Sequence, residues 1–387
     1  MIDLFDSFFM GGTVPLKNRI AMAPMTRTRT SDGDIPNALM ATYYAQRASA
    51  GLIVTEATDV APSSKGYAMT PGIHTDAQRD GWREVTRQVH RHGGTIFLQL
   101  WHVGRMAHSS LMPDNEAPWG VTAERADAAV FAHRPDGTLG HMAASAPRRL
   151  STGEVAALTD TFASACADAR QAGFDGVELH AANGYLFDQF VNSVLNTRTD
   201  RYGGSRVEDR TRFLLDVAAA AVRELGPGRV GVRLSPFGRF NAMPADPLAE
   251  QTLLYLAREL GRHGVAYLHL VYELMPTENM EVAEFTARHL DHALLAKVRD
   301  AFPWTIIWCG GFTDRAGAQN ALDTGLVDVI AFGRPYIANP DLAERLRNGW
   351  PLAAAARSAY YTRRDAAGYT DFAPYANDGT TTREDLQ

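Results

Sequence analysis

Short apolar runs recur along this chain and are separated mostly by longer segments with helical periodicity. Eight runs are rich in Val, Ile and Leu without alternating polar residues, which is typical of parallel strands buried on both faces. They cover Arg19–Met25, Leu52–Ala57, Thr95–Trp101, Gly176–His180, Arg229–Leu234, Ala266–Val271, Thr305–Cys309 and Val327–Phe332. The pattern predicts an α/β fold, a closed (β/α)8 TIM barrel.

Two segments fall outside this alternation. Residues Phe8–Lys17, with Gly11 and Gly12 at the centre, predict an N-terminal β-hairpin that plugs the bottom of the barrel. Residues Ala107–Arg149, dense in Pro, Gly and Asp, predict an excursion between the third and fourth strands rather than a second domain. We therefore expect one domain over residues 1–387, with a polar C-terminal tail at about 375–387.

Composition narrows the class of protein. The chain has 387 residues, 45% of them hydrophobic, and a formal net charge of -6, which gives no basic surface for nucleic acid or an acidic membrane. Its two cysteines, Cys166 and Cys309, stand in unrelated contexts, so we expect neither a disulfide framework nor a cysteine-based metal site. The N-terminus does not show the basic segment followed by an apolar run that a secretion signal has. We therefore expect a cytoplasmic location.

Polar residues gather at the C-terminal ends of the runs, where a barrel of this kind carries its chemistry. Thr26 and Arg27 directly follow the first run, and the third contains Gln99. Glycines at 310, 311 and 333, followed by Arg334, end the last two runs. Exposed backbone N–H groups beside an arginine suit a phosphate, which suggests a phosphorylated cofactor.

The stretch Gly176–Tyr185 brings an imidazole, a carboxamide and a phenol to one short loop. His180 and Asn183 can both donate hydrogen bonds to one substrate oxygen, and Tyr185 adds a hydroxyl. In a continuing strand residues 180 and 183 would face opposite sides, so the strand must end near His180 for them to converge. Gly184 suits such a break.

In order, these segments resemble the Old Yellow Enzyme family of flavin-dependent ene-reductases, over almost the whole chain. No single motif suffices for this resemblance, which depends on the ordered set. The matching motifs are Asn18–Arg27, Lys65–Tyr67, Leu98–His102, Glu178–Leu186, Asn196–Ser205, Val232–Gly238 and Ala331–Asp341.

The resemblance implies a non-covalent FMN on the barrel top, reduced by NADPH or NADH. It implies flavin contacts from Pro24, Thr26, Ala57, Gln99 and Arg233, and phosphate contacts from Gly311, Gly333 and Arg334. Tyr67, Trp101 and Tyr361 would shape the substrate face.

The implied reaction is reduction of the activated C=C bond of enones, enals and maleimides, with nitro compounds as a further class, by a ping-pong scheme. Hydride passes from flavin N5 to the β-carbon, while His180 and Asn183 hold the carbonyl. Tyr185 protonates the α-carbon. The segment 271–279 and the excursion are expected to set substrate choice.

Other interpretations compete with this one. Without the ordered set of motifs, Trp101 would be assigned to core packing and Arg233 to a structural ion pair. A flavin barrel that isomerises or dehydrogenates a pathway intermediate, or a catalytically silent binding barrel, stays open. The sequence does not choose between a monomer and a homodimer.

Overall fold

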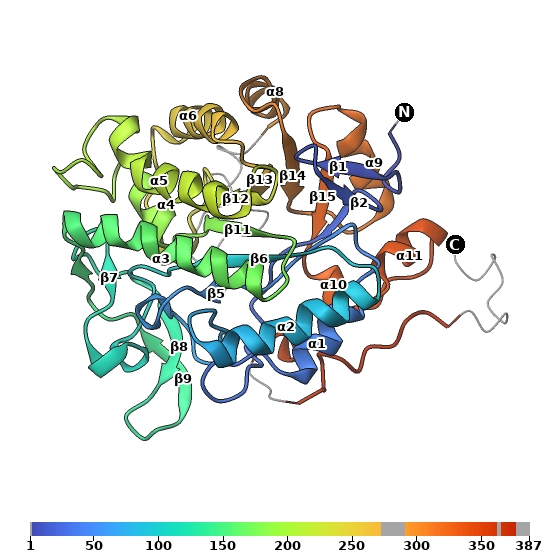
Figure 1. Cartoon of the computed structure of the whole chain (residues 1–387), viewed down its shortest axis with the longest axis horizontal. Helices are drawn as coiled ribbons and strands as arrows, with labels where there is room; N and C mark the ends of the chain where they lie inside the picture. Colours follow the sequence, from blue (N-terminus) through green and yellow to red (C-terminus); the bar gives the residue numbers. More distant parts are fainter. Residues whose placement is uncertain (1, 272–290, 362–364, 377–387) are drawn as a thin grey trace.

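The computed structural model describes residues 2–271, 291–361 and 365–376. Within them, eight parallel strands close into a barrel with helices outside, so the predicted fold is confirmed (Figure 1). The barrel strands are β3 (Ile20–Met22), β4 (Leu52–Val54), β6 (Ile96–Trp101), β11 (Gly176–Ala181), β12 (Val230–Leu234), β13 (Tyr267–Val271), β14 (Thr305–Cys309) and β15 (Val329–Phe332).

Two pairings complete the ring. Strand β15 pairs with β3, with Ala331 opposite Ala21, and β6 pairs with β11, with Gln99 opposite Glu178. In a closed parallel sheet all C-terminal strand ends meet on one rim, and no edge is left open. This rim is where the candidate chemistry lies.

Several predicted strands are too long, and the second shows why. The predicted run Leu52–Ala57 ends at Val54, and pairing with β6 resumes only at β5 (Thr58–Asp59). The backbone N–H of Glu56 donates to the Tyr44 hydroxyl (2.9 Å) instead of to a neighbouring strand. A side chain thus replaces the ladder partner, and the strand breaks.

Helices surround the barrel, and α2 and α3 run along its β6–β11 side (Figure 1). Both begin with a capping box, Thr75 with Gln78 and Ser151 with Glu154, which satisfies orphan N–H groups. The helices are α1 (Ala38–Ala45), α2 (Asp76–Arg91), α3 (Thr152–Gln171), α4 (Leu186–Val191), α5 (Val207–Leu225), α6 (Ala249–Arg262), α8 (His292–Ala301), α9 (Arg315–Asp323), α10 (Pro335–Ala338) and α11 (Leu342–Asn348). No described helix has both the length and the apolar character needed to cross a membrane.

The predicted N-terminal hairpin is present as β1 (Phe8–Met10) and β2 (Val14–Leu16). Its side chains Met10, Val14 and Leu16 join a buried cluster with residues from the barrel interior. The backbone N–H of Gly11 donates to Thr305 Oγ1 (3.1 Å) at the start of β14. The hairpin therefore closes the N-terminal end of the barrel.

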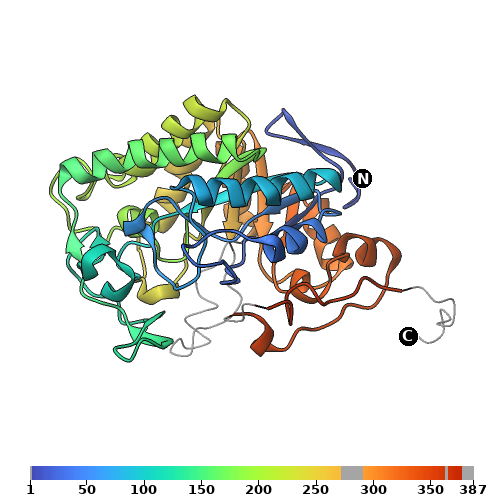
Figure 2. The same cartoon turned by 60° about the horizontal axis from the view of Figure 1, so that its bottom comes forward.

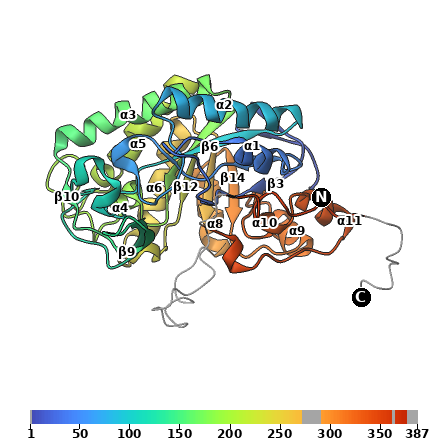
Figure 3. The same ribbon diagram turned by 90° about the horizontal axis from the view of Figure 1, so that it is seen from below.

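The excursion between β6 and α3 holds four further strands, β7 (Trp119–Gly120), β8 (Ala129–His133), β9 (Leu139–Ala143) and β10 (Arg148–Arg149). Strands β8 and β9 form an antiparallel hairpin on the side of the molecule opposite β1 and β2 (Figures 1 and 2). Figure 3 shows the excursion and the C-terminal segment with α10 and α11 on either side of the barrel. Both flank the functional rim.

Closure by the hairpin can be tested at two neighbouring glycines with positive φ. A Cβ on Gly11 (φ 55°) would lie 2.9 Å from Ala266 Cβ, whereas one on Gly12 (φ 74°) meets nothing closer than 3.9 Å. We expect Gly11→Ala to lower the free energy of unfolding by about 2–4 kcal/mol and Gly12→Ala by only about 1 kcal/mol, in urea titrations. Equal losses would show that the hairpin does not pack tightly against Ala266, the residue before β13.

Candidate active site

A break at the end of β11 creates the centre of the site. The strand ends at Ala181, one residue later than predicted, and Asn183 (φ 59°) and Gly184 (φ 75°) both take left-handed backbone conformations. A Cβ at Gly184 would lie 2.8 Å from the Phe240 carbonyl oxygen, so glycine is required there. Tyr185 then precedes α4 as its N-cap.

Hydrogen bonds from distant segments hold this turn. The Asn183 N–H donates to Ser235 Oγ (2.7 Å), and Asn241 Nδ2 donates to the Asn183 carbonyl (2.8 Å). The Gly184 N–H donates to Asp188 Oδ2 (2.8 Å) in the first turn of α4. This backbone geometry confirms the predicted break of the strand near His180.

Four aromatic rings gather beside the turn. The Tyr185 ring meets the His180 ring edge to face at 4.9 Å between centroids, and the Trp101 ring at 4.8 Å. The Trp101 ring also lies nearly parallel to the rings of His180 (6.2 Å between centroids) and Tyr67 (5.9 Å). The hydroxyls of Tyr67 and Tyr185 lie 3.3 Å apart. Residues far apart in sequence thus form one wall.

Burial sets the protonation of the two groups expected to act on substrate. It lowers the pKa of His180 well below its ordinary value, helped by the positive charges of Arg233 and His269. It raises the pKa of Tyr185 well above 10, helped by Tyr67. At neutral pH His180 is therefore an uncharged imidazole with one N–H, and Tyr185 is a protonated phenol.

Asp59, which was not predicted from the sequence as a site residue, forms a hydrogen bond that holds the Trp101 ring in place. Trp101 Nε1 donates to Asp59 Oδ1 (2.7 Å), and Thr70 Oγ1 donates to Asp59 Oδ2 (2.8 Å). Burial raises the pKa of Asp59 to about 7, against the opposing influence of Lys65. A carboxylate two residues past the end of the predicted run Leu52–Ala57 was a usable signal, but its partner lies 42 positions away.

The other predicted residues occupy the same rim. Pro24 and Thr26 follow β3, Ala57 lies between β4 and β5, Gln99 is in β6 and Arg233 is in β12. The phosphate candidates follow the last two strands, Gly311 after β14 and Gly333 with Arg334 after β15. Tyr361 is 52% exposed and lies on the C-terminal segment, near enough to Tyr67 and Tyr185 to raise their pKa values.

Comparisons with known proteins show which family this chain belongs to. The family model "NADH:flavin oxidoreductase / NADH oxidase family" matches residues 3–353. The chain belongs to this family. Its resemblance to Old Yellow Enzyme is thereby confirmed, and FMN is its cofactor.

Two curated relatives cover nearly the full chain. The 12-oxophytodienoate reductase 1 of Oryza sativa subsp. japonica is 41% identical over 364 residues, 93% of this chain and 90% of the relative. The chanoclavine-I aldehyde reductase of Penicillium roqueforti is 43% identical over 368 residues, 94% of each. A solved structure of morphinone reductase in complex with tetrahydroNAD superposes with a TM-score of 0.90 at 42% identity, covering 99% of this chain and 100% of that one.

Polar groups on the rim of this flavoprotein fit FMN. Arg233 Nε and His180 Nδ1 are buried without a hydrogen-bond partner among the described residues, so they suit a polar group seated on the rim. A Cβ on Gly333 would have only Met25 Sδ and Ala23 Cβ within 4 Å, both at 3.8 Å or more. The backbone there is therefore open to close approach by a phosphate.

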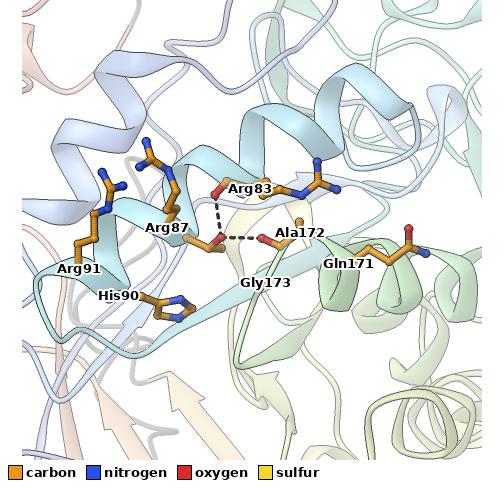
Figure 4. A pocket seen from close by; sticks show the side chains of 8 residues that line it. Arg83, Arg87, His90, Arg91, Gln171, Ala172 and Gly173 are labelled. Carbon is orange, nitrogen blue, oxygen red and sulfur yellow. Dashed lines mark hydrogen bonds between the residues drawn. The ribbon is translucent and has the colours of Figure 1, made fainter.

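A groove elsewhere on the flavoprotein is not a candidate for the active site. It lies between α2 and the end of α3, and Figure 4 shows Arg83 pointing away from Arg87 and Arg91. Arg83 pairs with Asp80 and Arg87 pairs with Glu84 in the same helix. The cations of the groove are thus largely neutralised, and we assign no function to it.

Because the pKa of Asp59 is raised, we expect the stability of the folded protein to depend on pH. In the unfolded chain an Asp titrates near 3.9, so between about pH 4 and 7 the folded protein binds more protons than the unfolded one. The free energy of unfolding therefore falls as pH rises through this range, by up to about 4 kcal/mol. Asp59→Asn keeps an acceptor for Trp101 and removes the penalty.

We expect Asp59→Asn to gain stability relative to the wild type above pH 7 and to gain none near pH 4. Urea unfolding at pH 4, 6 and 8 measures the difference. Parallel pH profiles for the two proteins would show that Asp59 titrates normally.

Proposed function

We propose that this flavoprotein uses NADPH or NADH to reduce the activated C=C bond of α,β-unsaturated carbonyl compounds. The observation that carries the proposal is the meeting of His180, the Asn183 turn and Tyr185 on the rim, with rings of His180 and Tyr185 4.9 Å apart. FMN, when bound, supplies the hydride for the β-carbon. The residues of the chain supply the rest.

His180 and Asn183 hold the substrate carbonyl. A neutral imidazole N–H and a carboxamide N–H donate to the oxygen and stabilise the negative charge that develops there as the β-carbon accepts hydride. The lowered pKa of His180 supports this role, because it keeps the imidazole uncharged with one N–H to donate. The left-handed backbone at Asn183 turns its side chain out of the strand pattern.

Tyr185 donates its proton to the α-carbon, which balances the hydride added at the β-carbon. The raised pKa of its phenol keeps that proton in place until a strongly basic carbon is formed. Tyr67, whose hydroxyl lies 3.3 Å away, holds the Tyr185 hydroxyl in position. Tyr67, Trp101 and Tyr361 form the walls that orient a flat substrate.

FMN is held by residues from several strand ends. Gln99 would bond the pyrimidine edge, Arg233 would stabilise negative charge on the ring, and Thr26 would donate to a ring carbonyl, with Pro24 and Ala57 packing alongside. Gly311, Gly333 and Arg334 would bind the phosphate. Their common position on the rim supports these assignments.

We expect the excursion between β6 and α3 to determine which substrates bind. A buried cluster joins Trp101 and Tyr185 to excursion residues such as Val130 and Ala144. The segment 271–279, which we also expect to set specificity, lies outside the described residues except for Val271. We further propose a single domain over 1–387 acting as a cytoplasmic monomer or homodimer.

Morphinone reductase, solved with tetrahydroNAD, supports nicotinamide binding by this chain. We expect the visible flavin band of the purified protein to bleach on anaerobic addition of NADPH or NADH and to return with 2-cyclohexenone. The faster nucleotide defines the preferred donor. Flavin that bleaches but is not reoxidised by enones would favour an isomerase or dehydrogenase of a specialised pathway. Absence of flavin after reconstitution would contradict the proposal.

Tyr185→Phe separates the two half-reactions. We expect flavin reduction by the nicotinamide to stay within about threefold of the wild type, whereas reoxidation by an enone slows by 10²-fold or more, because only the second step needs the proton. Stopped-flow absorbance follows each step. His180→Ala is the companion variant, expected to weaken both carbonyl-ligand binding and turnover. Equal slowing of both steps in Tyr185→Phe would remove Tyr185 from the donor role.

A further inference from the structure

One buried carboxylate inside the barrel has no part in the proposed chemistry. Glu178 lies two residues before His180 on β11, so its side chain also points into the barrel. It is fully buried. An ionised carboxylate in such a place must be paired and hydrogen-bonded, or it would destabilise the fold by several kcal/mol.

Both oxygens of Glu178 have partners. Gln99 Nε2 donates to Oε1 (2.7 Å), while the Tyr267 hydroxyl (3.1 Å) and His269 Nδ1 (2.8 Å) bond Oε2. The partners come from β6 and β13, and Gln99 stands directly opposite Glu178 in the β6–β11 register. Barrel closure itself therefore makes the contact with Gln99.

The charge of Glu178 is stable in this setting. Burial alone would raise its pKa, but the charge and hydrogen bond of His269, with the charge of Arg233, hold the pKa below the ordinary value. Burial alone would lower the pKa of His269, but the negative charge of Glu178 raises it above the ordinary value. An ionised carboxylate only accepts hydrogen bonds.

That restriction fixes the amide of Gln99. Its NH2 group must face Glu178, since the reversed amide would set a carbonyl oxygen against a carboxylate. No hydrogen bond among the described residues uses Gln99 Oε1, so the acceptor end of the amide is left for a ligand on the rim. The pyrimidine edge of a flavin carries an N–H between two carbonyls and needs an acceptor at that N–H.

We propose that Glu178 is a positioning residue for FMN: it orients the Gln99 amide so that its oxygen is presented to the flavin N–H. The inference rests on the assignment of Gln99 to FMN proposed above. Glu178 does not touch the cofactor in this scheme and acts through Gln99 alone. Its effect must therefore disappear when Gln99 cannot form hydrogen bonds.

A double-mutant cycle on FMN affinity tests this directly. Apoprotein is titrated with FMN, and the dissociation constant is taken from quenching of flavin fluorescence. We expect Glu178→Met to weaken binding by about threefold to tenfold, the range for one buried hydrogen bond. In a Gln99→Leu background the same change should weaken binding by less than twofold.

Tyr267→Phe is the matched control. It removes another hydrogen bond from the same carboxylate (3.1 Å) but leaves the Gln99 contact, so FMN affinity should stay within twofold of the wild type. An equal loss in Tyr267→Phe would mean that barrel packing, not the Gln99 amide, governs FMN binding. Should Glu178→Met fail to fold, Glu178→Gln replaces it in the cycle, since it removes the charge that forbids amide reversal.

The outcomes separate this inference from the proposed function. If Gln99→Leu alone leaves FMN affinity unchanged, Gln99 does not hold the flavin, and its proposed cofactor role fails. If Gln99→Leu weakens binding but the Glu178 variant does not, or if the two losses simply multiply in the double variant, the positioning role of Glu178 is wrong and the cofactor role of Gln99 stands.

Discussion

Closure of the barrel through the β6–β11 pair is the constraint on which the site depends. It sets Gln99 beside Glu178 and brings the end of β6, with Trp101, next to the end of β11, with His180. The backbone N–H and C=O groups of parallel strands form hydrogen bonds with the neighbouring strands. Because the ring is closed, no strand is left with a free edge. The chemistry of the rim thus depends on backbone pairing formed between segments about 80 residues apart.

Charges buried near the rim serve both stability and site geometry. Glu56 accepts from the backbone N–H groups of Arg27 and Thr28 at 3.1 and 3.2 Å, which fixes the loop after β3. Arg27 in turn donates to the carbonyls of Tyr360 and Gly368, tying down the C-terminal segment that carries Tyr361. Each buried charge is costly alone, but a network of them makes the loops around the rim one connected unit.

Much of this could be predicted from the sequence, because the strongest signals are local. All eight strands followed from apolar runs, and His180, Asn183 and Tyr185 lie within six residues, so the break in β11 could be deduced from strand periodicity. Strand ends were less accurate because side chains such as Tyr44 replace ladder partners.

The supporting contacts could not be predicted, since they join distant segments. The hydrogen bonds of Trp101 to Asp59, Asn241 to Asn183 and Gln99 to Glu178 span 42, 58 and 79 residues. Only the closed barrel determines which of many polar side chains meet. A glutamate between the apolar residues Val177 and Leu179 of a buried strand was nevertheless a sign that Glu178 has a buried partner.

A single physical cause prepares both substrate-facing groups. Low local dielectric disfavours charge of either sign, so the same burial lowers the pKa of His180 and raises that of Tyr185. Both then carry a proton that they can donate, one to a developing oxyanion and one to a carbon. Because exposure of the rim to water would weaken both shifts together, the apolar cluster that the excursion builds behind Trp101 and Tyr185 contributes to the chemistry as well as to packing.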